Sequence, residues 1–554
     1  LLLDSGTWFR LDRPELRRLR DLIEEAKALE DRPSDSLRLT PVQAGLFDEL
    51  VQLGVVTEQS ERWSRSAGAL LALEELPHPD PPAGLRAELR PYQLEGYQWL
   101  SLLWDLRLGG VLADDMGLGK TVQTLAMAAR AKADGSLGGE AGPLLVVTPT
   151  SVMATWASQA ATFCPDLDVR VIPETEKKSK RTIASQADGA DLVVTSFALF
   201  RIDEEAHRSV RWSGLVLDEA QFVKNHQAKT YQCARRLPAP FKLAITGTPL
   251  ENSLMDLWSM LSIVAPGLFP DPQRFKEFFQ RPIESGRSPE RLDALRRRVR
   301  PLMLRRTKDL VATDLPPKTE QVLDVSLNPQ HRRIYDTHLN RERQRVLRLV
   351  ADMDKNRITI LQSLTTLRQL TLDAALVDED YAGKCRSSKI DVLVEQLREV
   401  AAEGHRALVF SQFTRFLSTV RTRLTEEGIG SCYLDGRTRD RQQRIAEFTE
   451  GDAPVFLISL KAGGFGLNLT EADYVYILDP WWNPAAEEQA IDRTHRIGQD
   501  KPVMVYRLVA TDTIEQKVIA LQQRKRDLFA AVVDGGAASS GALTAEDVRE
   551  LFAS

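Results

Sequence analysis

One short segment carries residue types that can bind the phosphates of a nucleotide. It follows the apolar run that begins at Val111. In order it reads Asp114, Asp115, Met116, Gly117, Leu118, Gly119, Lys120 and Thr121. Glycines let backbone N–H groups close around phosphate oxygens, and a helix starting near Lys120 would add the positive end of its dipole. Lys120 would then reach the β- and γ-phosphates of ATP, and the Thr121 hydroxyl would ligate Mg²⁺. Because Asp114 stands where the general pattern has its first glycine, the motif alone also fits an ordinary strand-to-helix turn.

Two adjacent carboxylates follow a later apolar run. Asp218 and Glu219 come directly after Leu215–Leu217, at the carboxyl end of an expected strand. An acidic pair is often only a solvated loop, but hydrolysis at a phosphate loop needs both groups. Asp218 would hold Mg²⁺, and Glu219 would orient and deprotonate the attacking water.

Three further side chains fit the same chemistry. Gln93 lies just before the first expected lobe, where its amide could read the edge of adenine or could serve the fold alone. Arg493 and Arg496 are spaced to lie on one side of a helical turn. Paired arginines usually form surface salt bridges. Aimed at the γ-phosphate, they would stabilise the charge of the transition state once two lobes close.

Short apolar runs alternate with helical segments in two separate parts of the chain. The first set lies at 110–113, 144–148, 192–195, 215–217 and 242–246. The second set lies at 406–410, 431–434, 455–459, 474–478 and 503–508. Such alternation predicts parallel sheets with helices on both faces. The fold class is therefore α/β with two doubly wound lobes.

Composition shifts divide the chain into five parts. Four prolines between residues 77 and 82 mark a boundary. We expect a helical or mixed appendage at 1–80, a first, ATP-binding lobe at 85–265, helical protrusions and a linker at 266–380, and a second lobe at 381–530. Glycine and serine near residue 540 predict a flexible tail with a short helix at 531–554.

The composition excludes several classes of protein. The chain has 554 residues, of which 43% are hydrophobic and 27% charged, as in globular proteins. Its apolar runs are all shorter than the roughly 18 residues of a membrane span, so we expect a cytoplasmic protein without membrane contact. The four scattered cysteines form no CxxC pair, which predicts buried thiols and no structural zinc. The chain starts with Leu1, so we expect it to begin inside a longer one.

Charge gives a mixed indication about nucleic acid. The net charge of −5 argues weakly against such a partner. Two basic clusters argue in favour of such a partner, one between Arg296 and Lys308 and one between Arg332 and Arg345. Each fits either a solvated helix face or a contact with phosphate backbone.

Taken together, the motifs resemble those of a known family. They are Arg90-Pro91-Tyr92-Gln93, the phosphate loop, Asp218-Glu219-Ala220-Gln221, Thr246-Gly247-Thr248, Phe410-Ser411-Gln412-Phe413, Leu434-Asp435-Gly436 and Gln489–Gln499. Their order over residues 85–530 is similar to that of the Swi/Snf-type ATPases of helicase superfamily two, in a bacterial or archaeal branch. The resemblance implies two RecA-like lobes, helical protrusions and ATP hydrolysis coupled to tracking along double-stranded DNA.

The resemblance also implies roles for single residues. It assigns Lys120 and Thr121 to phosphate and Mg²⁺, Asp218 and Glu219 to metal and water, and Gln93 to adenine. Arg493 and Arg496 take the finger role, and Thr246–Thr248 would link the nucleotide to lobe movement. Asp115 and Gln221 depart from residues that many relatives carry, glutamate and histidine, which affects coupling more than hydrolysis.

The predicted function is that of an ATP-dependent translocase on double-stranded DNA. We expect a monomeric, nucleoid-associated motor that displaces or remodels DNA-bound proteins without separating strands. One alternative is a strand-separating helicase. The other is an ATPase stimulated by a protein partner, acting on RNA polymerase or in a defence complex.

Overall fold

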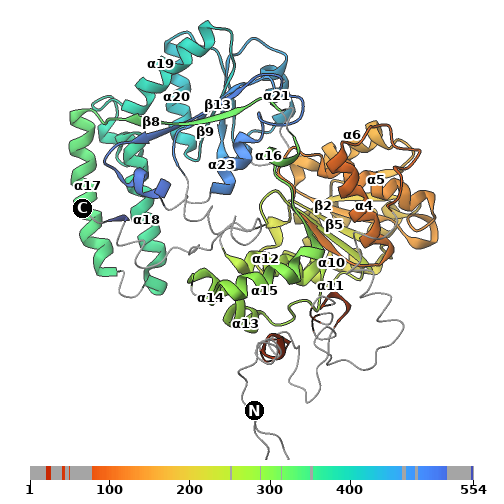
Figure 1. Ribbon diagram of the computed structural model, residues 1–554. Helices are drawn as coiled ribbons and strands as arrows, with labels where there is room; N and C mark the ends of the chain where they lie inside the picture. Colours follow the sequence, from red (N-terminus) through yellow and green to blue (C-terminus); the bar gives the residue numbers. More distant parts are fainter. Residues whose placement is uncertain are drawn as a thin grey trace, which may run out of the picture. The chain divides into compact units, whose positions relative to one another are not determined.

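The structure, a computed structural model, forms two compact units (Figure 1). It describes residues 20, 22–26, 40–43, 46, 49, 78–249, 253–286, 288–312, 315–349, 353–463, 469–480, 484–520 and 551–552. The described residues up to Val311 belong to the first unit, and those from Ala312 onward belong to the second.

The first unit contains a seven-stranded parallel sheet. Its strand order is β3-β4-β2-β5-β6-β1-β7. The central strands are apolar and fully buried, as expected when helices cover both faces of a parallel sheet. The strands are β1 (Gly110–Leu112), β2 (Leu144–Thr148), β3 (Val169–Ile172), β4 (Leu192–Ser196), β5 (Gly214–Asp218), β6 (Phe241–Ile245) and β7 (Met303–Leu304).

Helices cover both faces of this first sheet. Helices α4, α5 and α6 pack against one another on one face, and α9, α11 and α12 pack on the other (Figure 1). Their bounds are α4 (Pro91–Asp105), α5 (Lys120–Ala133), α6 (Met153–Phe163), α9 (Phe197–Ile202), α11 (Lys229–Arg236) and α12 (Leu254–Val264). The remaining helices are α7 (Glu176–Ser179), α8 (Ile183–Ala187), α10 (Glu204–Ser209), α13 (Pro272–Phe275), α14 (Arg281–Glu284), α15 (Pro289–Val299) and α16 (Lys308–Val311).

The second unit contains a six-stranded parallel sheet in the order β10-β11-β9-β12-β13-β8. Successive residues of β9 face opposite sides, so Ala407 and Val409 join one core cluster while Leu408 and Phe410 join another. The strands are β8 (Lys318–Val325), β9 (Ala407–Ser411), β10 (Ser431–Leu434), β11 (Val455–Ser459), β12 (Tyr474–Ile477) and β13 (Val503–Ala510).

The helices of the second unit bury both faces of its sheet and form one additional hairpin. Helices α19 and α20 contribute to the first core cluster, and α21 and α23 contribute to the second. The hairpin is α17 packed on α18, with a separate apolar core. The bounds are α17 (Pro329–Leu349), α18 (Met353–Leu372), α19 (Ser388–Ala402), α20 (Thr414–Glu426), α21 (Arg441–Thr449), α22 (Leu460–Gly463) and α23 (Pro484–Ile491).

The prediction of two parallel α/β lobes is confirmed, and all ten predicted strands are observed within about two residues of their expected ends. Three strands were not predicted: β3, β7 and β8. Strand β8 lies inside the segment 266–380, which the sequence indicated to be helical. That segment is divided between the units, with α13 to α16 in the first and β8, α17 and α18 in the second.

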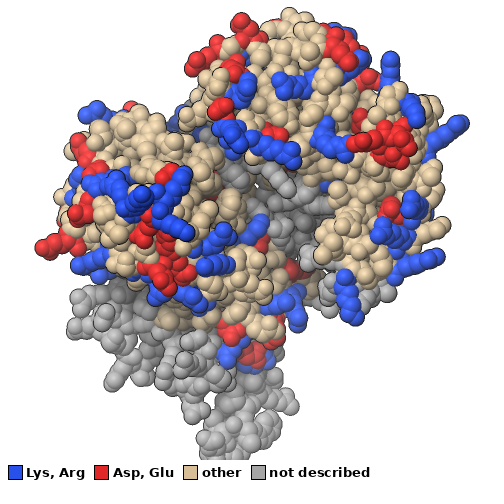
Figure 2. Space-filling view, turned by 180° about the vertical axis from the view of Figure 1, so that it is seen from behind, with Lys and Arg blue, Asp and Glu red and all other residues tan. Residues whose placement is uncertain are grey.

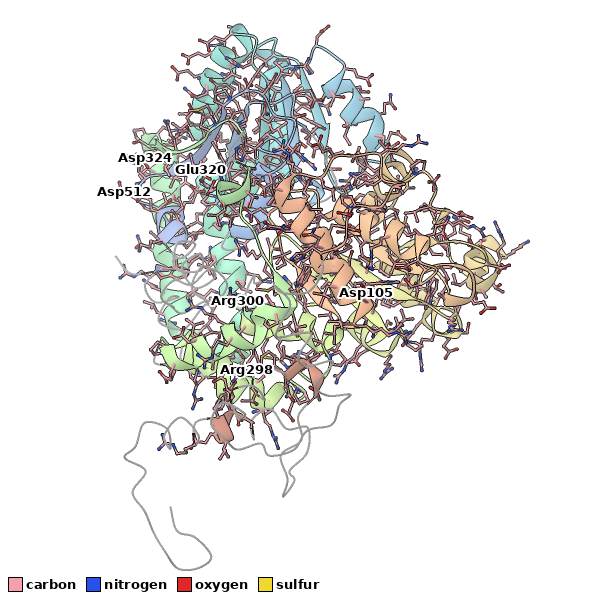
Figure 3. All side chains as sticks on the ribbon, turned by 45° about the vertical axis from the view of Figure 1, so that its right-hand side comes forward. Asp105, Arg298, Arg300, Glu320, Asp324 and Asp512 are labelled. Carbon is pink, nitrogen blue, oxygen red and sulfur yellow. The ribbon has the colours of Figure 1, made fainter. Side chains whose placement is uncertain are left out.

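The predicted appendage at 1–80 and tail at 531–554 lie mostly outside the described residues. The few described residues of the appendage belong to the first unit, where Leu22, Ala26 and Leu46 join the core. A buried ion pair also anchors it. Arg298 on α15 lies 2.9 Å from Glu25 and 2.7 Å from Glu49, and its side chain is only 2% exposed (Figure 3). At the other end of the chain, Leu551 and Phe552 pack into the core of the α17–α18 hairpin.

Candidate active site

The phosphate loop connects the buried strand β1 to helix α5. Its two glycines adopt left-handed conformations, Gly117 with φ 85° and Gly119 with φ 78°, which residues with a side chain rarely adopt. A Cβ at Gly119 would also lie 2.4 Å from the Gln93 amide nitrogen. Because α5 begins at Lys120, that residue and Thr121 stand at the amino terminus of a helix. This is a favourable place for an anion.

Lys120 is surrounded by acceptors and negative charge. Its ammonium donates to the carbonyls of Asp114, at 2.6 Å, and Asp115, at 3.0 Å. Removal from water lowers the pKa of Lys120, while the nearby charges of Asp114, Glu219, Asp115 and Asp218 oppose that change. The fold thus brings together the lysine and the acidic pair that the sequence predicted for one site.

Gln93 on α4 contacts the phosphate loop directly. Its amide nitrogen donates to the Leu118 carbonyl at 3.2 Å, and its amide oxygen accepts from the backbone N–H of Arg90 at 3.0 Å. Tyr92 and Gln123 donate to the same Leu118 carbonyl. Both ends of the Gln93 amide therefore support the fold, and adenine recognition by Gln93 stays a prediction.

Asp218 ends strand β5 and is held by side chains from two other elements. One carboxylate oxygen accepts from the Thr148 hydroxyl at 2.9 Å and from the Trp156 indole at 2.8 Å. Its other oxygen accepts the Glu219 backbone N–H at 3.0 Å. Burial raises the pKa of Asp218, and these hydrogen bonds together with Lys120 lower it. Thr148 and Trp156 were not predicted as site residues, because neither lies in the motif that contains Asp218.

Glu219 departs from the strand in a left-handed conformation, with φ 54° and ψ 56°. Its carboxylate accepts from the Gln221 amide at 2.9 Å. The amide oxygen of Gln221 accepts from the Thr246 hydroxyl at 3.0 Å, and Thr246 accepts the Thr248 backbone N–H at 3.0 Å. A chain of hydrogen bonds thus connects the acidic pair to the segment at 246–248.

The donor set of this site suits Mg²⁺. Asp218 supplies carboxylate oxygens and Thr121 a hydroxyl, and small divalent cations prefer oxygen ligands. Asp218 and Thr121 would hold the ion, which would polarise the phosphoryl oxygens of a bound nucleotide.

One residue outside the predicted site contacts the loop. Arg306, which precedes α16, donates to both carboxylate oxygens of Asp114, at 2.9 and 2.5 Å. The two residues are 192 positions apart, so no local spacing could have indicated the pair.

Arg493 and Arg496 lie in the second unit, in turns that follow the end of α23 at Ile491. Arg493 is buried, with 1% of its surface exposed, whereas Arg496 is partly exposed. The turn is fixed by contacts of its neighbours. The His495 ring lies 3.0 Å from the Pro316 carbonyl, and Gln499 donates to the carbonyls of Thr470 and Ala472. The two arginines therefore differ in access to a ligand.

The surface charge is mixed. On the face in Figure 2, Lys and Arg side chains are interspersed with Asp and Glu. The idea that the whole cluster from Arg296 to Lys308 contacts phosphate backbone is wrong, because Arg298, Arg306 and Lys308 are buried. Thr195 and Ser196, at the end of β4, are also buried and therefore cannot contact a phosphate backbone. The Thr195 hydroxyl donates to the Ile172 carbonyl, and Ser196 caps α9.

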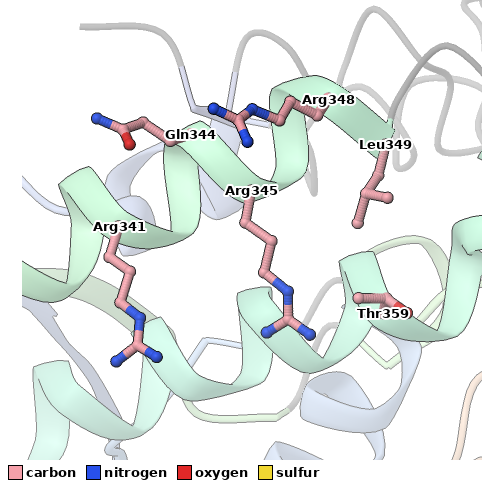
Figure 4. Close-up of a pocket in the computed structure, with 6 residues that line it drawn as sticks. All are labelled: Arg341, Gln344, Arg345, Arg348, Leu349 and Thr359. Carbon is pink, nitrogen blue, oxygen red and sulfur yellow. The ribbon is translucent and has the colours of Figure 1, made fainter.

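The second basic cluster is more accessible. In the α17–α18 hairpin, Arg341, Arg345 and Arg348 are exposed and lie along one helix (Figure 4). With Gln344, Leu349 and Thr359 they line a groove of about 430 Å³. Arg332, in contrast, donates to the carbonyls of Thr511 and Asp512. The segment 329–372, which contains α17 and α18, has nine Lys and Arg but only four Asp and Glu, in a chain whose net charge is −5.

Three further observations on the described residues concern the cysteines, metal-binding groups and membrane-spanning helices. The four cysteines are buried and free, as predicted. In the described ranges, no group of three or more His, Cys, Asp or Glu side chains is arranged to hold a metal ion. Likewise, none of the helices that the structure describes is long and apolar enough to cross a bilayer.

Known proteins are similar to this chain in sequence. The SNF2-related domain family matches residues 92–376, and the helicase conserved C-terminal domain family matches residues 388–498. The putative ATP-dependent helicase/translocase YwqA of Bacillus subtilis is 32% identical over 99% of this chain and 60% of its own length. The ISWI chromatin-remodeling complex ATPase ISW1 of Saccharomyces cerevisiae is 31% identical over 82% of this chain and 41% of its own length. The chain thus spans less than two thirds of these relatives.

A solved structure is also similar. It is the Sulfolobus solfataricus SWI2/SNF2 ATPase core in complex with double-stranded DNA, which is 32% identical to this chain. The match covers 86% of this chain and 99% of that one, with a TM-score of 0.43.

Proposed function

Because the chain belongs to the SNF2-related family of ATP-dependent helicases and translocases, we propose that it moves along double-stranded DNA by hydrolysing ATP. Movement would displace or remodel proteins bound to the DNA, without separating its strands. Members of this family are ATP-hydrolysing enzymes of the helicase type. A motor of this kind would act at the nucleoid in the cytoplasm. Since one chain carries both units, we propose that it works as a monomer.

The observation that carries the proposal is the convergence of Lys120, Asp218 and Glu219 in the first unit. They stand at the carboxyl ends of β1 and β5, where open α/β sheets bind their ligands. Lys120 would leave the loop carbonyls that it now contacts and bind the β- and γ-phosphates of ATP. Glu219, held by Gln221, would orient a water molecule in line with the γ-phosphate and accept its proton.

The second half of the catalytic site would come from the other unit. Arg496 is the better candidate for the finger, because it is partly exposed whereas Arg493 is buried. Its guanidinium would stabilise the charge that spreads over the γ-phosphate in the transition state. We propose that the hydrogen-bonded chain from Glu219 through Gln221 to Thr246 reports the nucleotide state to the segment at 246–248.

We assign the DNA contact to side chains that reach solvent. Thr150 and Ser151, after β2, are exposed in the first unit. In the second unit, the arginine groove of Arg341, Arg345 and Arg348 offers several guanidinium groups to a phosphate backbone. Arginine forks match phosphate oxygens and read no base sequence. Binding is therefore expected to be independent of sequence and strongly weakened by salt.

The test is ATPase activity of the purified chain with duplex DNA, single-stranded DNA, RNA or no nucleic acid. It is followed by displacement of the third strand from a triplex and by a strand-unwinding assay on the same duplex. The proposal expects duplex-selective stimulation and triplex displacement without unwinding. Unwinding would identify a strand-separating helicase. Stimulation by a protein partner but by no nucleic acid would point to the partner-dependent ATPase.

A further inference from the structure

Arg306 makes several hydrogen bonds in and beside the phosphate loop. Besides both oxygens of Asp114, its guanidinium donates to the Gln123 amide oxygen at 2.8 Å and to the Tyr92 carbonyl. The Arg306 side chain is 8% exposed and the Asp114 side chain is fully buried. Four buried acceptors suit the several donors of the planar arginine fork and cannot all be reached by the single ammonium of lysine.

The backbone around Arg306 is bonded to the same loop. Strand β7 pairs in parallel with β1, and the Ala113 N–H donates to the Leu304 carbonyl at 2.7 Å. Two residues further on, the Asp115 N–H donates to the Arg306 carbonyl at 3.0 Å. The Lys308 N–H in turn donates to the Asp115 carboxylate at 3.0 Å. The last segment of the first unit before Val311 is therefore hydrogen-bonded along the loop.

The negative charge of Asp114 would disfavour phosphate binding, and Arg306 compensates it. A carboxylate stands where the general phosphate loop has a glycine, next to the place where the phosphates of ATP would bind. An uncompensated negative charge there would repel the nucleotide, and a buried carboxylate without a partner is itself costly. The fork of Arg306 cancels this charge. Gly96 leaves the room it needs, since a Cβ at Gly96 would overlap the Gln123 amide and crowd Arg306.

We propose that Arg306 is a positioning residue of the ATP site. It neutralises Asp114, so that the loop accepts phosphate, and it ties the loop to the segment through which the chain leaves the first unit. This inference rests on the proposed ATP site, but it concerns a residue outside the phosphate loop and the acidic pair.

The experiment compares four forms of the chain, each covering residues 1–554: wild type, R306Q, D114N/R306Q and R298Q. The dissociation constant of a fluorescent ATP analogue and the thermal unfolding midpoint are measured for each. R298Q is the matched control, because Arg298 is also a buried arginine paired with carboxylates in the first unit, bonded to Glu25 and Glu49 instead of the loop. A purely structural role for Arg306 would make R306Q behave like R298Q.

We expect R306Q to raise the dissociation constant by about tenfold or more, because a buried carboxylate loses its partner. R298Q should keep the wild-type constant even where its unfolding midpoint falls as far. D114N/R306Q should recover most of the lost affinity, since the uncompensated charge is gone. Wild-type affinity in R306Q, or an equal loss in R306Q and R298Q, would overturn the proposal, as would the absence of rescue.

If R306Q does not fold, the comparison of D114N/R306Q with wild type decides the matter. An affinity within tenfold of wild type supports charge neutralisation, and a greater loss overturns it. A wild-type chain that binds no ATP analogue would instead refute the proposed function, and this inference with it. The two failures are thus distinguished by the wild-type arm of the series.

Discussion

Replacement of Glu320 by glutamine tests whether charge holds the edge strand β8 on the second sheet. Among the strands that the structure describes, β8 pairs with β13 alone, and its outer residues are largely polar. Glu320 on β8 lies 2.5 Å from Arg507 on β13 and 2.8 Å from Lys318 on its own strand (Figure 3). Arg507 also lies 3.1 Å from the buried Glu487, so the charges form a small network.

The size of the effect follows from the pKa of Glu320. Burial by itself raises this pKa, but the charges of Arg507 and Lys318 outweigh burial and lower it from 4.5 to about 2. A difference of this size between unfolded and folded chain corresponds to at most about 3 kcal/mol. Because 28% of the side chain is exposed, we expect about 2 kcal/mol.

The sign of the pH dependence is fixed by the same shift. At neutral pH, Glu320 is ionised in both states and its stabilisation is complete. As the pH falls below 4.5, Glu320 binds a proton in the unfolded chain, whereas in the folded chain it does so only near pH 2. The stabilisation is therefore present above pH 4.5 and is lost towards pH 2. E320Q should differ from wild type most at pH 7 and by about half as much at pH 3.

Pulse proteolysis in urea, with cleavage sites mapped to the second unit, would measure the free energy of unfolding at both pH values. D324N is the matched control: it removes the same charge from the same strand at an exposed position (Figure 3). The reasoning is refuted if E320Q and D324N lose equal stability, or if the loss in E320Q does not depend on pH.

Three predictions concern ATP turnover and DNA binding. E219Q should bind ATP normally and lose about a hundredfold or more in turnover, because it removes the carboxylate that we propose orients water and leaves the phosphate loop intact; near-normal hydrolysis would contradict this. R496A should keep ATP binding and lose about a thousandfold of DNA-stimulated turnover, and wild-type turnover would remove Arg496 from the finger role. R341E/R348E should weaken duplex binding and lower the slope of log affinity against log salt by about 2, as measured by fluorescence anisotropy. An unchanged slope would exclude the groove as a DNA contact. The control makes the same charge change on α19 and α20, with Arg398→Glu and Arg415→Glu.

The sequence predicted those strands whose residues are apolar on both faces. Strands such as β2 and β11 read as short continuous apolar runs because helices bury them from both sides. Strand β8 gave no such run. Its sequence, Lys-Thr-Glu-Gln-Val-Leu-Asp-Val, is mostly polar because an edge strand exposes much of its surface. Strand β7 has only two residues, too few for any periodicity.

Residues of the candidate site were predictable where a single motif contains them. Lys120 in its loop and Asp218 at its strand end could be identified from local pattern. The partners of these residues could not. Arg306 reaches Asp114 across 192 positions, and Trp156 reaches Asp218 across 62. Such pairs depend on the order of strands in the sheet, which a single sequence does not specify.

The backbone at Glu219 explains how two consecutive carboxylates can face different partners. Along a strand, successive side chains point to opposite faces, so an extended Glu219 would point away from the site of Asp218. The left-handed turn at Glu219, with φ 54°, breaks this alternation at a cost of about 1–3 kcal/mol for a residue other than glycine. Asp218 keeps its contacts with Thr148 and Trp156, while Glu219 turns to Gln221. The cost of this strain is therefore already met when the chain folds, and the carboxylate that we propose orients water is held by Gln221 in the folded chain.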